Sequence, residues 1–375
     1  MRSLVAAVVA FAAPPAVRAQ CPIARDYWPT KGWRAASPST QGMDSLALDA
    51  ALTRLGRDYP AVDGVVVIRH GYAVAERYYH GHGPKDRVDL FSATKSVTSI
   101  LIGIALDRHL FRDVEQSIAD FIPEYFARAD ADSAKRRISV RNLLTMTSGL
   151  DWDESHAADY FRDAPGQAVG ILRRKLVAEP GTRFNYSSGN AHLLAIALSH
   201  ASKTTPRDFG NDNLFVPLGF TVRFLDWPAD ENGVNSGGSA LELSPREMAK
   251  LGYLYLNAGC WDGRQIVSAE WVAQSIRKWS ESGPPPNGNG YGYLWWLSSV
   301  IERAYMAIGY AGQYILVAPS QDMVVAAVAH PTPEGSRHFE VLRDVVLSAA
   351  GETRPRSARS GQPSAPGAAT DNRPP

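Results

Sequence analysis

The sequence predicts a mixed α/β (α+β) protein in which segments from the two ends of the chain form one antiparallel sheet flanked by helices. Two patterns support this prediction, one near each end. Residues 63–79 contain two apolar runs joined by Arg69-His70-Gly71, which is typical of a hairpin with glycine in the turn. Residues 313–328 contain two further apolar runs, which are joined by the turn-forming residues Pro319-Ser320-Gln321-Asp322. The stretch between the hairpins is mainly helical in pattern, so we expect a helical domain inserted into the sheet domain.

The order of these patterns divides the chain into two domains. We expect the sheet domain to comprise residues 20–112 and 230–350, and the helical domain to comprise residues 113–229. The spacing of apolar residues predicts helices over residues 138–146, 168–177, 192–202, 245–256 and 269–279.

The two ends of the chain have compositions unlike the rest. Residues 1–19 have a basic residue, a short apolar stretch and small residues before a cleavage position after Ala19, which predicts a secretory signal peptide and an exported protein, periplasmic or secreted. The apolar stretch is about half of the roughly 20 residues that a membrane span needs, so we expect no membrane span. Residues 351–375 lack large apolar side chains, and we expect a disordered tail there.

Charge and composition restrict the partners. Hydrophobic residues make up 45% of the 375 residues, and 39 Lys and Arg nearly balance 38 Asp and Glu. Nucleic acids and acidic membranes would need a basic surface, so we expect neither, and a small neutral substrate fits better. The nine histidines are scattered, and His80 and His82, the closest pair, have no third ligand nearby. We therefore expect no metal and no cofactor.

The chain has two cysteines, Cys21 and Cys260. In an exported protein an even count favours a disulfide, so this pair is the disulfide candidate. The alternative is two unpaired thiols, one of them in a mobile terminus.

A serine and a lysine one helical turn apart open an apolar helix. Ser92 and Lys95 lie in Phe91-Ser92-Ala93-Thr94-Lys95, and residues 99–106 then show no polar face over two turns. A serine hydroxyl is a weak nucleophile unless a base lies beside it, and a lysine is such a base where burial lowers its pKa. A second Ser-x-x-Lys pair, Ser275 and Lys278, lies in a polar stretch, where we expect both side chains to be solvated.

A third candidate is Tyr186, on the loop that follows Pro180-Gly181-Thr182 and precedes a helix. A phenol beside an ammonium ion could relay a proton between Ser92 and a leaving group. By itself, a tyrosine in such a loop is more often a packed residue than a functional one.

Six ordered motifs over about residues 40–345 resemble those of the serine β-lactamase-like hydrolases. The branch that the chain is most similar to holds the 6-aminohexanoate-dimer hydrolases and the β-lactamase-fold esterases, which are relatives of class C β-lactamases and D-alanyl-D-alanine carboxypeptidases. The motifs are Phe-Ser-x-x-Lys-Ser at 91–96, Leu-Leu-Thr-Met-Thr-Ser-Gly-Leu at 143–150, Pro-Gly-Thr-x-Phe-x-Tyr-Ser-Ser-Gly-Asn at 180–190, Leu-Phe-x-Pro-Leu-Gly at 214–219, Tyr-Gly-Tyr-x-Trp-Trp at 291–296 and Gly-Gln-Tyr at 312–314.

The resemblance implies a β-lactamase/transpeptidase-like fold and a role for each candidate. Ser92 would be the acylated nucleophile, Lys95 its base and Tyr186 the proton relay. The backbone N–H groups of Ser92 and Tyr310 would form the oxyanion hole, a contact whose loss costs about 3–4 kcal/mol.

Two departures from the family pattern bear on the substrate. Enzymes that act on β-lactams typically have Tyr-x-Asn and Lys-Thr-Gly, and here Ser188 takes the place of the asparagine and Ala307-Ile308-Gly309 that of the second motif. Without that lysine a substrate carboxylate loses a charge-assisted contact, so we expect a small ester or a linear amide as substrate. Candidate substrate-binding residues are Ser188, Gly309, Trp152 and Tyr160, with Trp295 and Trp296 as further pocket walls.

Other functions stay open. The first alternative is a β-lactamase or a D-alanyl-D-alanine carboxypeptidase, and the second is a non-catalytic binding protein with the same fold. A Ser-His-Asp hydrolase would need a G-x-S-x-G elbow, which the sequence lacks.

Overall fold

The computed structural model describes residues 21, 23–129, 133–157, 167–282, 290–332 and 339–348. The predicted signal peptide (1–19), the predicted tail (351–375) and Tyr160 lie outside the described residues. In the part of the chain that is described, no helix is both long enough and apolar enough to cross a bilayer.

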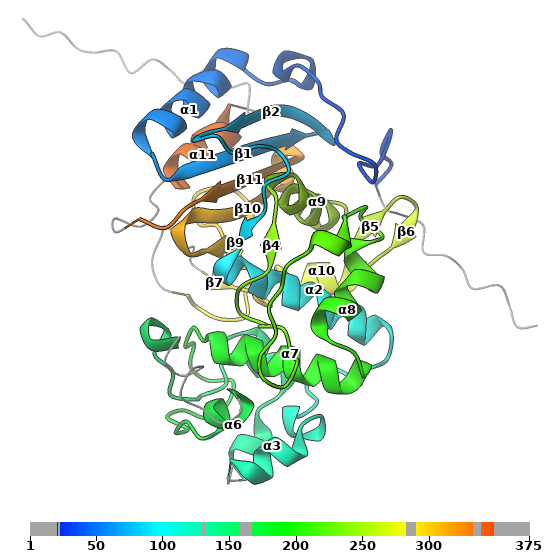
Figure 1. Cartoon of the computed structure of the whole chain (residues 1–375), viewed down its shortest axis with the longest axis vertical. Helices are drawn as coiled ribbons and strands as arrows, with labels where there is room; N and C mark the ends of the chain where they lie inside the picture. Colours follow the sequence, from blue (N-terminus) through cyan, green and yellow to red (C-terminus); the bar gives the residue numbers. More distant parts are fainter. Residues whose placement is uncertain are drawn as a thin grey trace, which may run out of the picture.

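A seven-stranded antiparallel sheet forms the centre of the molecule (Figure 1). Its order is β2-β1-β11-β10-β9-β8-β7, so the two hairpins from opposite ends of the chain meet where β1 pairs with β11, with Val66 opposite Ala326. This pairing confirms the predicted sheet built from both ends. The strands are β1 (Val62–Arg69), β2 (Tyr72–Tyr78), β7 (Gly290–Tyr291), β8 (Trp296–Leu297), β9 (Tyr305–Gly309), β10 (Gln313–Ala318) and β11 (Met323–Ala329).

Both predicted hairpin turns are present, and their backbone explains the residues that form them. Between β1 and β2, His70 and Gly71 have φ of 50° and 87°, the left-handed pair that matches the twist of a two-residue hairpin. Between β10 and β11, Pro319 starts a short 3₁₀ turn and Asp322 ends it with φ of 46°. The Asp322 carboxylate binds the guanidinium of Arg25 at 2.6 and 2.7 Å, which fixes the N-terminal segment to this turn.

The alternation of side chains along β1 divides the core into two layers. Val65 and Val67 face a cluster with α1 (Ser45–Asp58) and α11 (Phe339–Leu347), which cover one face of the sheet. Val66 and Ile68 face the other cluster, which includes α9 (Pro245–Leu256) and the central helix α2 (Thr94–Asp107). Burial on both faces explains why residues 65–68 of β1 form an unbroken apolar run rather than an alternating pattern.

Helices α3 (Pro123–Arg128), α6 (Gln167–Leu172) and α7 (Ser188–Ser202) lie at the end of the molecule away from α1 and α11 (Figure 1). The domain boundaries proposed from the sequence stay a prediction. The helix predicted at 192–202 begins earlier, at Ser188, because the Ser187 hydroxyl caps it by accepting from the Asn190 N–H at 3.1 Å. The other elements are α4 (Val140–Leu144), α8 (Pro206–Gly210), α10 (Ala269–Ser275), and the small pairs β3 (Val88–Asp89) with β4 (Glu242–Leu243) and β5 (Cys260–Trp261) with β6 (Arg264–Gln265).

A disulfide joins Cys21 to Cys260, with the two Cα atoms 5.6 Å apart. It ties the segment before α1 to the first residue of β5, 239 residues later in the chain. Trp28 packs on the same region, with its ring 5.6 Å from that of Trp261 and 5.9 Å from that of Tyr253.

Candidate active site

Helix α2 positions the Ser-x-x-Lys pair. Every residue from Thr94 to Ala105 is buried, so the first turn of the helix is held rigidly by packing on all sides. Ser92 lies on the 3₁₀ turn Phe91–Ala93 that leads into α2, and Lys95 lies one turn further on. The sequence prediction of a buried central helix with both groups at its start is confirmed.

The turn before Ser92 is sharp and is held by one carboxylate. Phe91 has φ of 46°, a left-handed conformation that is strained for an aromatic residue by about 1–3 kcal/mol. Oδ1 of Asp89 accepts from the N–H of Phe91 at 2.7 Å and from that of Ala240 at 3.0 Å. Burial raises the pKa of the Asp89 carboxyl, and these two N–H groups oppose that rise. The Asp89 side chain therefore fixes the direction of the backbone between β3 and Ser92.

Lys95 makes three hydrogen bonds from a buried position. Its side chain is 1% exposed, and Nζ lies 2.9 Å from Ser92 Oγ, 2.8 Å from Ser188 Oγ and 3.0 Å from the carbonyl oxygen of Gly238. The first distance is within the reach of direct proton transfer. The structure thus brings together Ser92 on the 3₁₀ turn, Lys95 on α2 and Ser188 at the start of α7.

The carbonyl of Gly238 belongs to a tightly held loop that sequence analysis missed. Thr98 donates to the neighbouring Gly237 carbonyl at 2.8 Å, and the Gly237 N–H donates to Nδ1 of His192 at 3.4 Å. A Cβ on Gly237 would lie 2.1 Å from the carbonyl oxygen of Ala191, so only glycine allows this approach. No motif in the sequence points to this loop, because its contribution is made by backbone atoms.

Tyr186 presents its ring to Lys95. The Nζ atom lies 4.8 Å from the ring centroid, in the position of a cation–π contact. The ring packs on Trp296, with centroids 5.4 Å apart, and on the edge of Tyr291. Among the described residues, none forms a hydrogen bond with the Tyr186 hydroxyl.

Glu154 is the charged neighbour of this group that the sequence analysis did not find. Its Oε2 accepts from Trp152 Nε1 at 2.7 Å and from the Ser188 N–H at 2.8 Å, and its Oε1 accepts from the Ser188 hydroxyl. Oε1 also lies 3.6 Å from Lys95 Nζ. The only sequence signal is an acidic stretch, Asp-Trp-Asp-Glu, after the Thr-Ser-Gly-Leu motif, and such stretches are usually solvated surface.

Trp152, which the sequence predicts to line the pocket, is only 5% exposed and lies next to Glu154, to which its indole nitrogen donates. A Cβ on Gly189 would lie 2.6 Å from its ring, so the indole supports the start of α7. Trp295 is fully buried, whereas Trp296 is partly buried beside Tyr186.

The end of β9 lies against the turn that carries Ser92. A Cβ on Gly309 would lie 2.1 Å from the Leu90 carbonyl oxygen, so the two backbones are nearly in contact. Tyr310 follows directly, and its exposed ring meets the edge of Phe91 at a centroid distance of 5.6 Å. The backbone of residues 309 and 310 therefore lies next to the candidate nucleophile.

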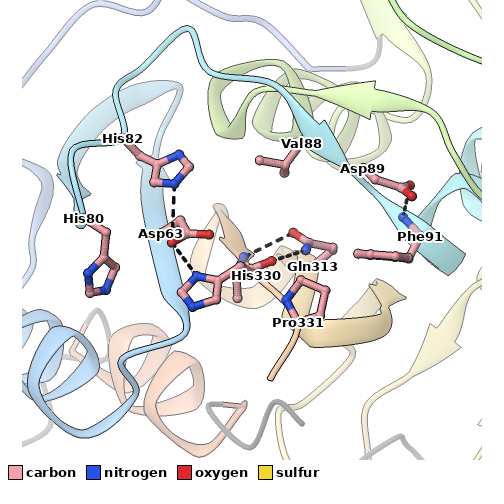
Figure 2. Close-up of a pocket in the computed structure, with 10 residues that line it drawn as sticks. Asp63, His80, His82, Val88, Asp89, Phe91, Gln313, His330 and Pro331 are labelled. Carbon is pink, nitrogen blue, oxygen red and sulfur yellow. Dashed lines mark hydrogen bonds and ion pairs between the residues drawn. The ribbon is translucent and has the colours of Figure 1, made fainter. Parts of the chain in front are cut away.

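A cavity of about 460 Å³ adjoins the same turn (Figure 2). Phe91 and Asp89 line it on one side, and Asp63, His82 and His330 line it on the other. Oδ1 of the buried Asp63 accepts from His330 Nδ1 at 2.8 Å and lies 3.6 Å from His82 Nε2. Among the described residues, no group of three or more His, Cys, Asp or Glu side chains could hold a metal ion.

In the second Ser-x-x-Lys pair, the lysine is exposed as predicted but the serine is not. Ser275 is fully buried at the end of α10 and donates to the Val272 carbonyl at 2.9 Å, so the expectation of a solvated serine is wrong. Lys278 lies outside that helix and pairs with Glu281 at 2.7 Å on the surface. The serine is buried because Tyr255 and Tyr293 pack around the end of the helix, which a local polar pattern does not reveal.

Comparison with known protein families shows to which family the chain belongs. The sequence profile of the beta-lactamase family matches residues 49–350. The chain belongs to the beta-lactamase family. This confirms the resemblance found in the sequence, and the sheet with its flanking helices is the fold of that family.

Relatives of this beta-lactamase-family protein include hydrolases of different substrates. The 6-aminohexanoate-dimer hydrolase of Paenarthrobacter ureafaciens is 24% identical over 347 residues, which cover 85% of this chain and 86% of that protein. Among solved structures, a family VIII carboxylesterase (16% identity, TM-score 0.63) matches 84% of this chain and 98% of its own. A penicillin-binding protein homologue from Caulobacter crescentus (15% identity, TM-score 0.65) matches 82% and 98%. These structures are similar in fold.

Proposed function

We propose that the protein is a serine hydrolase that cleaves small esters or linear amides through an acyl-enzyme intermediate on Ser92. The observation that carries this proposal is the 2.9 Å distance between Lys95 Nζ and Ser92 Oγ in a buried site. A nucleophile next to a held base is the arrangement that activated serines need.

Acylation begins with Lys95 as a neutral amine. The Ser92 hydroxyl proton passes to Nζ as Oγ attacks the substrate carbonyl carbon, and the carbonyl oxygen becomes an oxyanion. The C–O or C–N bond then breaks, and the leaving alcohol or amine takes a proton that Lys95 returns through the Tyr186 hydroxyl. The products are the Ser92 ester and the free leaving group.

Deacylation reverses these roles with water as the nucleophile. Water gives a proton to the Tyr186–Lys95 pair and attacks the ester carbon, and Ser92 Oγ leaves as a hydroxyl after taking that proton back. In both steps the oxyanion would lie between the backbone N–H groups of Ser92 and Tyr310. The close packing of Gly309 on Leu90 supports this role, because it keeps the two backbones near each other.

The substrate class follows from what the site lacks and from the relatives. Ala307-Ile308-Gly309 at the end of β9 supplies no cation for a substrate carboxylate. A 6-aminohexanoate-dimer hydrolase and a family VIII carboxylesterase are among the similar proteins, and their names denote a linear amide and an ester substrate. We also propose that the protein is exported, which the Cys21–Cys260 disulfide supports because such bonds persist in oxidising compartments.

Intact-mass spectrometry tests the proposed function. Wild type and Ser92→Ala are incubated with a fluorophosphonate and, separately, with a short p-nitrophenyl ester. The proposal expects an adduct on wild type only, together with ester turnover. A protein with neither adduct nor turnover would be a binding protein that has kept the fold, and one that hydrolyses a chromogenic cephalosporin but ignores short esters would be a β-lactamase.

A further inference from the structure

We propose that Glu154 is a positioning residue that directs the protons around Lys95 through the hydroxyl of Ser188. The inference rests on the proposed function, in which neutral Lys95 takes the proton of Ser92. It concerns a residue that lies 3.6 Å from Lys95 Nζ without a hydrogen bond to it, and that lies 62 positions after Ser92 in the chain.

The hydroxyl of Ser188 lies between an acceptor and the lysine. Glu154 Oε1 contacts Ser188 Oγ on one side, and Lys95 Nζ lies 2.8 Å from the same Oγ on the other. A carboxylate only accepts hydrogen bonds, and a serine hydroxyl has a single proton. The Ser188 proton is therefore directed to Glu154, and a lone pair of Oγ faces Lys95.

This orientation leaves Lys95 one way to arrange its own protons. The carbonyl of Gly238, 3.0 Å from Nζ, is also an acceptor only. A neutral amine has two N–H groups and one lone pair. With acceptors at Ser188 and Gly238, both N–H groups are engaged, and the lone pair is left to face Ser92 Oγ at 2.9 Å. That is the arrangement that removes a proton from Ser92.

Glu154 is itself held in place for this task. Trp152 Nε1 and the Ser188 N–H both donate to Oε2, at 2.7 and 2.8 Å. Two donors on one oxygen fix the carboxylate plane and leave Oε1 for the Ser188 hydroxyl. The 3₁₀ turn Glu154–His156 that carries it is capped by Asp153, which accepts from the Ser155 N–H at 3.0 Å.

Glu154→Gln reverses one hydrogen bond and preserves the shape of the side chain. The amide oxygen can still accept from Trp152 and from the Ser188 N–H, and the amide nitrogen then takes the place of Oε1. That nitrogen donates to Ser188 Oγ, so the Ser188 proton turns toward Lys95 and competes with Ser92 for the lone pair. We expect the acylation rate constant to fall about 10²-fold, which is the usual cost when a distant change misplaces a catalytic group, here Lys95. The substrate dissociation constant and the Tm should not change.

A double-mutant cycle separates this role from others. Stopped-flow acylation by a p-nitrophenyl ester is measured for wild type, Glu154→Gln, Ser188→Ala and the double variant. If Glu154 acts through Ser188, the two substitutions are not additive: Glu154→Gln changes acylation in the Ser188→Ala background by less than about twofold, which is the usual scatter of such cycles. An equal slowing in both backgrounds would mean that the carboxylate acts directly by its charge, 3.6 Å from Nζ, and would overturn the inference. A lowered Tm with a raised dissociation constant would mean a structural role and would also overturn it.

Glu179→Gln is the matched control, because this carboxylate is 68% exposed and pairs only with Arg137 among the described residues. It should acylate as wild type does. The rate of fluorophosphonate labelling of Ser92 gives a second readout that is independent of the ester chosen. Normal labelling and acylation in Glu154→Gln would overturn the inference and leave the proposed function intact, whereas a wild type that forms no Ser92 adduct would overturn both.

Discussion

Gly309 and Leu90 are in backbone contact across the candidate site: a Cβ added to Gly309 would lie 2.1 Å from the Leu90 carbonyl oxygen. Gly309 has φ of −117°, which any residue can adopt, so the requirement for glycine here comes from space and not from conformation. Leu90 precedes the strained turn of Phe91, and Tyr310 follows Gly309. The contact therefore sets how far the N–H of Tyr310 lies from the nucleophile.

Gly309→Ala should weaken catalysis more than it weakens the fold. The new methyl group pushes the end of β9 away from Leu90, so the N–H of Tyr310 moves off the oxyanion. We expect kcat/KM for a p-nitrophenyl ester to fall about 10²–10³-fold, as for the loss of an oxyanion-hole donor. The free energy of unfolding should fall by about 1–3 kcal/mol from overpacking. Steady-state kinetics and chemical denaturation measure the two effects.

Gly83→Ala is the control for that variant, since the nearest atom to an added Cβ there is 4.0 Å away. It should match wild type in both measurements. Full activity in Gly309→Ala would show that Tyr310 has no part in the oxyanion hole.

Asp89 offers a test of the strained turn. Asp89→Asn keeps an oxygen that can accept from Phe91 and Ala240, whereas Asp89→Ala leaves both N–H groups without it. We expect Asp89→Ala to lose about 1–3 kcal/mol of stability and most of its acylation rate. Asp89→Asn should keep its acylation rate.

The effect of Asp89→Asn on the free energy of unfolding should depend on pH. Burial raises the pKa of Asp89 above its ordinary value, so the folded state binds this proton more tightly than the unfolded state does. The contribution of the group to stability is then complete below pH about 4 and is lost as the pH rises through the folded pKa. Denaturation at pH 4 and pH 7 should show Asp89→Asn gaining stability relative to wild type at the higher pH. No difference between the two pH values would contradict the assignment.

The sequence was sufficient for the two hairpins that form four strands of the sheet and for the buried helix with the Ser-x-x-Lys pair, for physical reasons. Strands buried on both faces contain unbroken apolar runs, so β1 and β11 were visible as runs, and a buried helix with serine and lysine at its start is locally distinctive. Helix lengths were less certain. The helix predicted at 269–279 ends at Ser275, because the chain there turns to let Tyr293 donate to the Ser275 carbonyl at 2.9 Å.

What the sequence could not show are contacts made by backbone atoms or across loops. Gly238 contributes a carbonyl oxygen, which leaves no residue-specific signal. Glu154 is brought to Ser188 by the packing of Trp152 under the start of α7, 34 residues away in the chain. Such tertiary contacts override what a local acidic stretch suggests.

Substitutions of the proposed nucleophile and of its proposed base should have similar effects on activity. Ser92→Ala removes the atom that is acylated, and Lys95→Ala removes the base, leaving the Gly238 carbonyl and the Ser188 hydroxyl without their shared donor. Groups that act as one unit are not additive, so the double variant should be no slower than Ser92→Ala. Circular dichroism should report a folded Ser92→Ala. Turnover close to wild type in either single variant would rule out the assignment.

Tyr255 should make the protein sensitive to alkaline pH. It is fully buried between α2 and Trp295, and burial raises its pKa to about 12. Below pH 10 the phenol is neutral in both states, so its contribution to stability is complete. Above pH 10 the Tyr255 phenol ionises in the unfolded chain but not in the folded chain. The free energy of unfolding therefore falls through pH 12 by up to about 1.4 kcal/mol per pH unit for this group.

Tyr255→Phe should therefore lose stability with a shallower slope than wild type in urea denaturation between pH 10 and 12. Data at pH 8 serve as the internal control, where the variant lacks only the weak 3.3 Å hydrogen bond between the Tyr255 phenol and Ser275 Oγ. Parallel slopes for the two proteins would mean that Tyr255 reaches water before the chain unfolds.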